Sequence, residues 1–202
     1  MILSLEILSI DLFSGCGFSE LTNHDLSPYN SSDFALTPTS SQTYAESSLL
    51  LSPPEDINCT HFVALNGEDG NLGTESEPWG SFQYAAELAS PGDVVCFREG
   101  DYGTQDIHVK KSGEPNALIT FAAYPGEHPV LDGGGIANEL LVLDGGVSNL
   151  RISGFTIQNF RIWGLFLTGE NHYIHLDHLT IEGGETSIRL TYGESSEGPA
   201  LE

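Results

Sequence analysis

Two stretches of the chain carry the same order of apolar and polar positions. Residues 150–157 read LRISGFTI and residues 174–181 read IHLDHLTI, so four apolar positions return at one constant offset (174 − 150 = 24), which we call the coil offset. Thr156 returns as Thr180 at the same offset. A period of about 20–50 residues is typical of stacked repeats, in which equivalent positions lie on top of each other and bury a continuous core.

Short apolar runs separated by polar corners continue this pattern from residue 94 to residue 190. Three runs in each ~23 residues predict a coil of three short strands, and about four such coils would form a parallel β-helix. Each coil would pair in register with the next at a spacing of about 4.8 Å, with alternate residues pointing inward. The rows predicted to stack are Val94, Ile119, Leu150 and Ile174; then Ile107, Val130, Phe155 and Leu179; then Leu141, Leu165 and Ile188.

A β-sandwich is the alternative fold, since its strands also recur every ~8–12 residues. A sandwich gives no reason for one offset that four apolar positions and a threonine share. It also needs hairpin turns, whereas the joins here are short and have Ser-Gly or Asp-His corners. The pattern therefore favours the parallel β-helix.

One short helix is predicted before the first coil, and the Pro-Gly pair at 91–92 ends it. Terminal units of a stacked-repeat protein cover its open apolar end, so we expect this helix to cap the first coil. The polar segment after residue 190 offers no equivalent cap. We therefore expect either a longer natural protein or another element over the last coil. The apolar positions of the helix, at i, i+3, i+4 and i+7, are Phe82, Ala85, Ala86 and Ala89.

Composition divides the chain into three parts. Residues 1–59 are predicted to be a low-complexity, disordered segment, because residues 27–53 contain 11 Ser/Thr and three Pro. Such a composition buries too little apolar surface to offset the entropy of ordering. Residues 60–193 are the predicted β-helix, which we expect to be truncated, and residues 194–202 are a polar tail.

The chain has 6 Lys and Arg against 29 Asp and Glu, a formal charge of −23. Affinity for nucleic acid comes largely from basic residues that neutralise phosphates, so we expect no nucleic-acid partner. The acidic surface suits cations, neutral ligands or a salty exterior. No run reaches the ~20 apolar residues of a membrane span. Glu6 and Asp11 interrupt the apolar start of the chain and no Lys or Arg precedes Arg98, so an export signal is not clearly recognisable.

The chain has three cysteines, and one stays unpaired if any two of them join. Cys59 precedes the first strand-like run and Cys96 lies inside the run DVVCF, so a disulfide between them is geometrically feasible. The alternative is that Cys59 and Cys96 are small buried hydrophobic residues.

A longer stretch resembles a known family. The segment FVALNGEDGNLGTESEPWGSFQYAAELASPGDVVCFREGDYG, followed by LITFAAYPGEHPVLDGGG and later by WGLFLTG, resembles the N-terminal part of right-handed parallel β-helix proteins of the pectate-lyase type. The resemblance covers about residues 60–192 and is closest to the calcium-dependent polysaccharide lyases. It implies an all-β, right-handed parallel β-helix, a polysaccharide or glycan partner, Ca²⁺ as cofactor and an extracellular or cell-surface location. The active site of such lyases lies further along, so we expect most catalytic coils beyond this chain.

The resemblance also suggests what the outward residues would do. Such lyases remove the proton α to a uronate carboxylate, which requires a basic side chain and a cation. Arg151, which would bind the carboxylate, stacks beside His175, which would act as base, at the coil offset. Ser153 stacks beside Asp177 in the same way, and these two residues with Trp163 are the candidate substrate-binding residues. Ordinary cross-coil pairing on the surface is the alternative.

The polar turn NGEDGNLGTESE is chemically suited to Ca²⁺, because it combines oxygen-bearing side chains with Gly-bent backbone. Asp69, Asn71 and Glu75 are its candidate ligands. A plain turn at Asn66-Gly67 without a metal is the alternative.

Two functions follow from these features. The first is a fragment of a polysaccharide (polyuronate) lyase, an enzyme acting by Ca²⁺-assisted β-elimination. The second is a non-catalytic glycan-binding or surface-adhesion module. Scarce lysine favours the second, since Lys110 and Lys111 are the only lysines and their place in an early loop predicts solvated charge.

Overall fold

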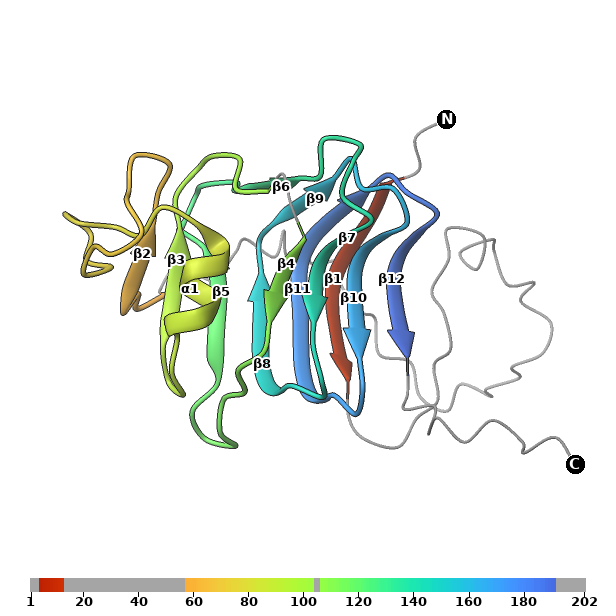
Figure 1. Cartoon of the computed structure of the whole chain (residues 1–202). Coiled ribbons are helices and arrows are strands. Elements are labelled where there is room, and N and C mark those ends of the chain that lie inside the picture. Colours follow the sequence, from red (N-terminus) through yellow and green to blue (C-terminus); the bar gives the residue numbers. More distant parts are fainter. Residues whose placement is uncertain (1–3, 13–56, 104–105, 192–202) are drawn as a thin grey trace, which may run out of the picture.

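The computed structural model describes residues 4–12, 57–103 and 106–191 (Figure 1). These residues form twelve strands and one helix. In chain order the elements are β1 (Ser4–Leu12), β2 (His61–Val63), α1 (Phe82–Leu88), β3 (Val94–Phe97), β4 (Ile107–Val109), β5 (Ile119–Ala123), β6 (Val130–Asp132), β7 (Glu139–Leu143), β8 (Ser148–Ser153), β9 (Thr156–Gln158), β10 (Trp163–Thr168), β11 (His172–Glu182) and β12 (Thr186–Thr191).

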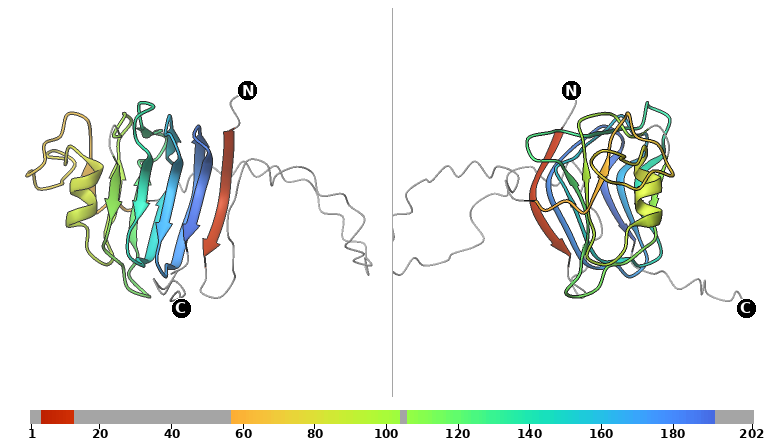
Figure 2. Two further views of the ribbon diagram at one scale, coloured as in Figure 1. Left: turned by 45° about the vertical axis from the view of Figure 1, so that its right-hand side comes forward. Right: turned by 90° about the vertical axis from the view of Figure 1, so that its left-hand side faces the viewer.

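The strands form two sheets whose members come from successive circuits of the chain. Sheet A has the order β2-β3-β5-β8-β11-β9-β6, with β1 paired to β11, and sheet B has the order β12-β10-β7-β4. Every strand pair is parallel except β1–β11. Each circuit visits sheet A and then sheet B and returns one position further along the stack (Figure 2). This arrangement is a parallel β-helix, as the sequence predicts.

The coil offset is the pairing register between β11 and the strands β8 and β9. Ile174 pairs with Leu150, and Thr180 pairs with Thr156. The prediction that these positions stack is confirmed. A β-sandwich is excluded for this region, because its two sheets are antiparallel.

The first predicted row is correct except at its start. Val94 pairs with Thr120, one position past the predicted partner Ile119. This shift places Val94 half-buried, while Ile119 is fully buried. The third row pairs as predicted, in the order Leu141, Leu165 and Ile188.

The second predicted row is wrong for Ile107, and it is shifted by one position at Val130, whose partner is Thr156 and not the predicted Phe155. Ile107 pairs with Leu141 in sheet B, so its step to the next coil (141 − 107 = 34) is longer than the coil offset. Its expected place in sheet A is taken by Asp101, which bridges to Val130, and Val130 in turn pairs with Thr156. An apolar run shows that a strand faces the core, but it does not show which wall of the coil the strand joins.

The inward residues of both sheets form one hydrophobic cluster. Its aromatic part is a group of four rings with centroid separations of 4.6–6.4 Å. One ring comes from α1 and the others from β3, β5 and the residue just before β9, so the helix shares the core of the coils. The four rings are Phe82, Phe97, Phe121 and Phe155.

Polar side chains complete the contact between α1 and the edge of sheet B. The side-chain amide of Gln83 accepts a hydrogen bond from the His108 N–H (2.8 Å) and donates one to the His108 carbonyl (3.3 Å). Lys111 Nζ donates to the carbonyls of Leu88 (3.2 Å) and Ala89 (3.1 Å) at the end of the helix. The prediction that Lys111 is only a solvated charge is therefore wrong, since a cation at a helix C-terminus bonds to carbonyls that lack intrahelical partners.

The corners of successive coils also stack at the coil offset. Asn149 and Tyr173 both have φ of 55°, and Gly154 (φ 82°) is followed one coil later by His178 (φ 52°). A left-handed backbone conformation costs a non-glycine residue about 1–2 kcal/mol. Tyr173 and His178 adopt it nevertheless, because they stack on Asn149 and Gly154, which have the same conformation in the preceding coil. This repetition explains why the Ser-Gly corner returns as Asp-His.

Residues 1–59, predicted to be disordered, contain the strand β1 in the structure, while residues 13–56 and the tail 192–202 lie outside the described residues.

Cys59 and Cys96 are joined in a disulfide, with their Cα atoms 5.7 Å apart. The structure therefore has the predicted disulfide and not the alternative of two separate buried thiols. It ties the segment before β2 to β3. Within its described part the structure has no helix that is long and apolar enough to span a membrane.

Reduction of the Cys59–Cys96 disulfide should destabilise the protein by roughly 4 kcal/mol. The bridge closes a loop with a sequence separation of 37, and the chain-entropy model gives about 4 kcal/mol for a loop of this length. Urea unfolding with and without reductant measures the difference. The Cys16→Ser variant is the control and should behave as the wild type. Equal unfolding midpoints in both conditions would contradict the assignment.

Candidate functional site

The predicted surface group lies on β8 and β11 of sheet A. Arg151 pairs in register with His175, and Ser153 pairs with Asp177. The structure therefore brings these four residues together as the coil offset predicts. Their burial differs from that of an open binding surface, since Ser153 is 2% exposed and Asp177 is 9% exposed.

Arg151 and Asp177 form a cross-coil ion pair. Arg151 Nη2 lies 2.6 Å and Nε lies 2.9 Å from Asp177 Oδ2, and both nitrogens also reach Oδ1. A planar guanidinium engaged at two nitrogens is held in a fixed orientation. This geometry supports ordinary cross-coil pairing for Arg151 and Asp177, because the guanidinium already has a carboxylate partner.

The residues of the polar turn take three different roles. Asp69 accepts hydrogen bonds from the N–H groups of Gly80 (3.1 Å) and Ser81 (3.0 Å) and from the Ser81 hydroxyl (2.7 Å), so it ties the turn to the start of α1. Asn71 Nδ2 donates to the Pro78 carbonyl (2.9 Å). Glu75 is exposed and lines a hollow on the same end of the molecule.

Acidic, histidine and cysteine side chains do not gather into a cluster in the described part of the chain. Over residues 57–103 and 106–191, no group of three or more His, Cys, Asp or Glu side chains could hold a metal ion. The oxygens of Asp69 already accept three protein donors. The oxygens of Asp69 are thus engaged within the turn, and the Ca²⁺ ligation expected of Asp69, Asn71 and Glu75 stays a prediction.

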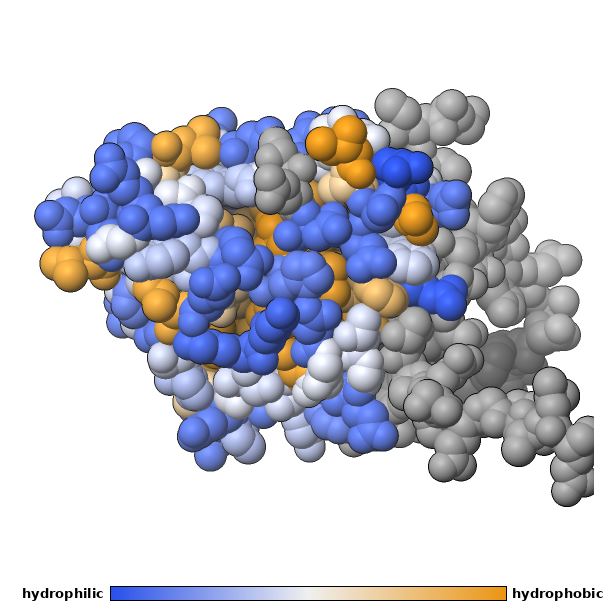
Figure 3. Space-filling view, viewed as in Figure 1, coloured by the Kyte–Doolittle hydropathy of each residue, from blue (hydrophilic) through white to orange (hydrophobic). Residues whose placement is uncertain are grey.

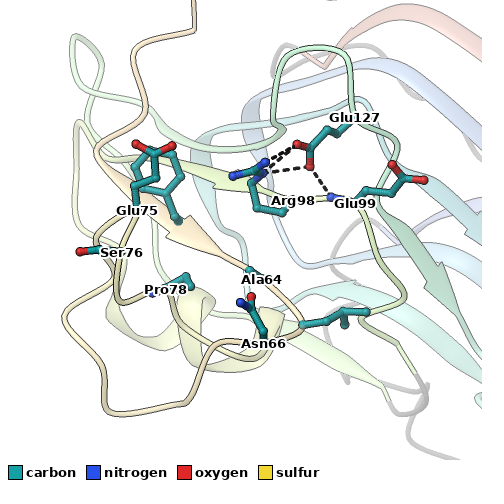
Figure 4. A pocket seen from close by; sticks show the side chains of 10 residues that line it. Ala64, Asn66, Glu75, Ser76, Pro78, Arg98, Glu99 and Glu127 are labelled. Atoms are coloured by element: carbon teal, nitrogen blue, oxygen red, sulfur yellow. Dashed lines mark hydrogen bonds and ion pairs between the residues drawn. The ribbon is translucent and has the colours of Figure 1, made fainter.

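The hollow next to Glu75 has a volume of about 530 Å³ (Figure 4). Glu127 lies at its wall, where Arg98 Nε donates to Oε1 (2.8 Å) and Oε2 (3.0 Å) and the Glu99 N–H donates to Oε2. The Arg98 guanidinium also lies over the ring of Tyr124, 4.5 Å from its centroid. The hydrogen bonds from Arg98 lower the pKa of Glu127, and Glu127 in turn raises the pKa of Arg98. The charge of Arg98 is therefore balanced by the carboxylate of Glu127.

The stabilising effect of Glu127 should depend on pH. Its folded-state pKa lies below the ordinary value of 4.5, so its contribution is present above that value and is lost as the pH falls through the lower folded-state pKa. The difference in unfolding free energy between the wild type and Glu127→Gln should be largest near neutral pH and should shrink on acidification. Urea unfolding across pH measures it. Glu99→Gln, which changes an exposed side chain in the same hollow, is the matched control. A difference that is independent of pH would contradict this account.

Trp163 lies on a different wall from Arg151, since β10 belongs to sheet B. Its ring stacks on Phe166, with centroids 4.5 Å apart and an interplanar angle of 28°, and we call these two residues the aromatic pair. Strict alternation would place positions three apart on opposite faces. Here Gly164 and Leu165 are both buried, and a Cβ on Gly164 would collide with core atoms, so both rings remain half-exposed on the outside.

The surroundings of the aromatic pair combine cations and carboxyl groups. Arg161 is exposed two positions before Trp163, and Arg189 pairs in register with Phe166. Glu139 pairs in register with Trp163. Burial, followed by the charge of nearby Asp106, raises the pKa of Glu139.

Cations are scarce elsewhere on the described surface, which is mostly hydrophilic in the view of Figure 3. Of the six Lys and Arg, Arg98 and Arg151 pair with carboxylates and Lys111 bonds to the end of α1. Arg161, by contrast, is exposed next to the aromatic pair. Sequence reasoning missed Arg161 and Phe166; the signal that could have found Phe166 is Gly164, which interrupts the alternation.

Stacked parallel coils with a polar outer surface define a parallel β-helix protein. The model of the Pel9A-like, right-handed β-helix region matches residues 61–198, and the chain belongs to this family. The resemblance to β-helix proteins of the pectate-lyase type is thereby confirmed, including the right-handed turn of the coils.

The chain is similar to several individual proteins. It is 31% identical over 137 residues to the uncharacterized protein YwoF of Bacillus subtilis (strain 168), a match that covers 62% of this chain and 29% of that protein. The chain thus spans under a third of the length of this curated relative. Among solved structures it is 21% identical to the pectate lyase Pel9A, with a TM-score of 0.47, covering 58% of this chain and 33% of that one. It is also 21% identical to a rhamnogalacturonan lyase, with a TM-score of 0.46, covering 56% and 34%.

Proposed function

We propose that this protein acts on a polysaccharide and that its substrate class is a polyuronate. The single observation that carries the proposal is membership in a family named after Pel9A, which is a pectate lyase. The reaction we propose is β-elimination assisted by Ca²⁺. The β-helix that carries it would have about four coils, the first of them capped by α1. The activity of the whole protein is part of this proposal, because the chain spans only a fraction of its relatives.

The aromatic pair is the part of the described surface that best fits a uronate. Sugar rings have apolar faces that pack on exposed aromatic rings, and Trp163 and Phe166 are two half-exposed rings stacked on each other. A uronate also carries a carboxylate, and Arg161, exposed two positions before Trp163, is the cation proposed to bind it. We therefore propose that this wall of sheet B contacts substrate, in addition to the predicted group around His175.

Calcium would offset the charge repulsion between the protein and its substrate. A protein of charge −23 repels a polyanionic substrate, and a divalent cation that neutralises the uronate carboxylate would remove this repulsion and acidify the α proton. His175 remains the candidate base. Arg151 is a positioning residue in this proposal, because Asp177 occupies its guanidinium.

A non-catalytic glycan-binding or surface-adhesion module is the second candidate function. It is supported by the pairing of Arg98 and Arg151 with carboxylates and by the lack of a three-residue metal group among residues 57–103 and 106–191. Both candidates share an extracellular or cell-surface location. The Cys59–Cys96 disulfide supports it, since disulfides persist in oxidising compartments.

The test of both functions measures product and binding separately. The protein is incubated with polygalacturonate, rhamnogalacturonan and a neutral polysaccharide, with Ca²⁺ or with a chelator, and the unsaturated product is followed by its absorbance. Product that requires Ca²⁺ supports the lyase. Binding without product supports the second candidate, and neither binding nor product with any polymer overturns both.

Variants locate the contact surface. Trp163→Ala should weaken binding about tenfold, which corresponds to about 1.4 kcal/mol of lost ring contact. Arg161→Gln should weaken binding of the polyuronate but not of the neutral polymer. Leu72→Ala and Lys110→Gln remove an exposed apolar and an exposed cationic side chain elsewhere and should bind as the wild type does. Equal losses in all four variants would contradict the assignment.

A further inference from the structure

The last described coil of sheet A is as well buried as the coils inside the stack. Ile174, Leu176, Leu179 and Ile181 of β11 are 0–1% exposed, although among the described residues no further coil follows β11 in sheet A. What lies at this edge is β1, the strand nearest the N-terminus (Figure 1, Figure 2). It pairs with β11 antiparallel.

The sequence of β1 has the pattern of a coil. Residues 5–12 read LEILSIDL, with apolar residues at positions one, three, four, six and eight of the stretch and polar residues at two, five and seven. The coil segments 150–157 and 174–181 also have apolar residues at positions one, three, six and eight. The four shared apolar positions are symmetric, because reversal exchanges position one with eight and three with six. A strand that carries them can therefore match the coil in either direction.

The observed register uses this symmetry. Polar or charged residues of β1 lie opposite polar residues of β11 at Glu6–Thr180, Ser9–Asp177 and Asp11–His175. The centre of β1, between Leu8 and Ser9, lies at His178, the left-handed residue of β11. The apolar pairs are Leu5–Ile181, Ile7–Leu179, Ile10–Leu176 and Leu12–Ile174.

We propose that the outer edge of β11 is a strand-binding site and that its occupant is residues 4–12 of the same chain. An open strand edge presents unpaired N–H and C=O groups and invites association with other chains. Added strands are bound through main-chain hydrogen bonds, and alternate side chains provide specificity. Here the specificity is the symmetric apolar pattern of β1. This occupancy makes β1 the cover of the β11 edge.

The length of the connection permits this return. Positions 13–60 separate Leu12 from His61 in the sequence. A connection of this length spans at most about 160–170 Å when extended, whereas the five strand spacings of sheet A from β2 to β1 cover only about 24 Å at about 4.8 Å each. The same length would let β1 of one copy reach β11 of a second copy, so exchange between copies is an outcome that the experiment must separate.

The experiment uses the full chain and changes only the order of residues in β1. In the pattern-breaking variant, Glu6 exchanges with Ile7 and Ile10 with Asp11 (Glu6→Ile, Ile7→Glu, Ile10→Asp, Asp11→Ile). In the matched control, the apolar residues exchange among themselves (Leu5→Ile, Ile7→Leu, Ile10→Leu, Leu12→Ile). Both variants keep the composition and charge of the wild type. A fluorescent peptide with the sequence of residues 4–12 is then titrated into each protein.

The proposal expects the peptide to bind the pattern-breaking variant at least about tenfold more tightly than the wild type or the control, whose edge is occupied. A peptide with the broken pattern should not bind. Equal binding to all three proteins, or no binding to any of them, would overturn the proposal. Light scattering of the wild type distinguishes a monomer, which supports occupancy within one chain, from an exchanged dimer, which contradicts it.

Hydrogen exchange of the wild type gives an independent result, whether or not the pattern-breaking variant folds. The proposal expects the amides of Ser4–Leu12 to exchange at least about tenfold more slowly than those of an unpaired strand. Unprotected amides throughout this segment would refute the strand pairing.

Discussion

Parallel pairing of equivalent positions, one coil on top of the next, is the constraint on which the rest of this structure depends. Each inward residue must fit between the corresponding residues of the coils beside it, since interiors are close-packed. Leu150 and Ile174 satisfy this condition in β8 and β11. The backbone obeys it too, because His178 adopts a left-handed conformation where the previous coil has Gly154. Function is thereby confined to the outward residues and the corners.

The outward residues show how an acidic chain uses its few cations. Arg98 forms an ion pair with Glu127 from another segment, and Arg151 forms one with Asp177 from the next coil. These ion pairs connect neighbouring parts of the stack. Arg161 remains exposed beside the aromatic pair. This distribution is the reason that the proposed polysaccharide contact lies on sheet B, while the group first predicted on sheet A is largely an internal ion pair.

Sequence periodicity was sufficient to predict the fold but only part of the site. The coil offset predicted the pairing of Thr156 with Thr180 correctly, because an unbroken repeat preserves register. It failed for Ile107, since a strand's apolar pattern is the same on every wall of the coil and a long corner hides which wall follows. Phe166 was missed because two consecutive buried positions shift the alternation. The ion pair of Arg151 and Asp177 could not be foreseen, since stacking pairs Arg151 with His175 and the diagonal contact depends on side-chain conformation.

Cross-linking of engineered cysteines tests the stacking of coils most directly. Thr156 and Thr180 are register partners, so their Cα atoms should be about 4.8 Å apart, within the range of about 4.4–6.8 Å that a disulfide requires. In a Cys16→Ser background, Thr156→Cys with Thr180→Cys should form a disulfide on mild oxidation, as detected by mass spectrometry of proteolytic fragments. Thr156→Cys with Glu182→Cys, about 8 Å apart from the same strand spacing and rise, should remain reduced. A disulfide in the second variant and none in the first would contradict the register, and with it the parallel β-helix.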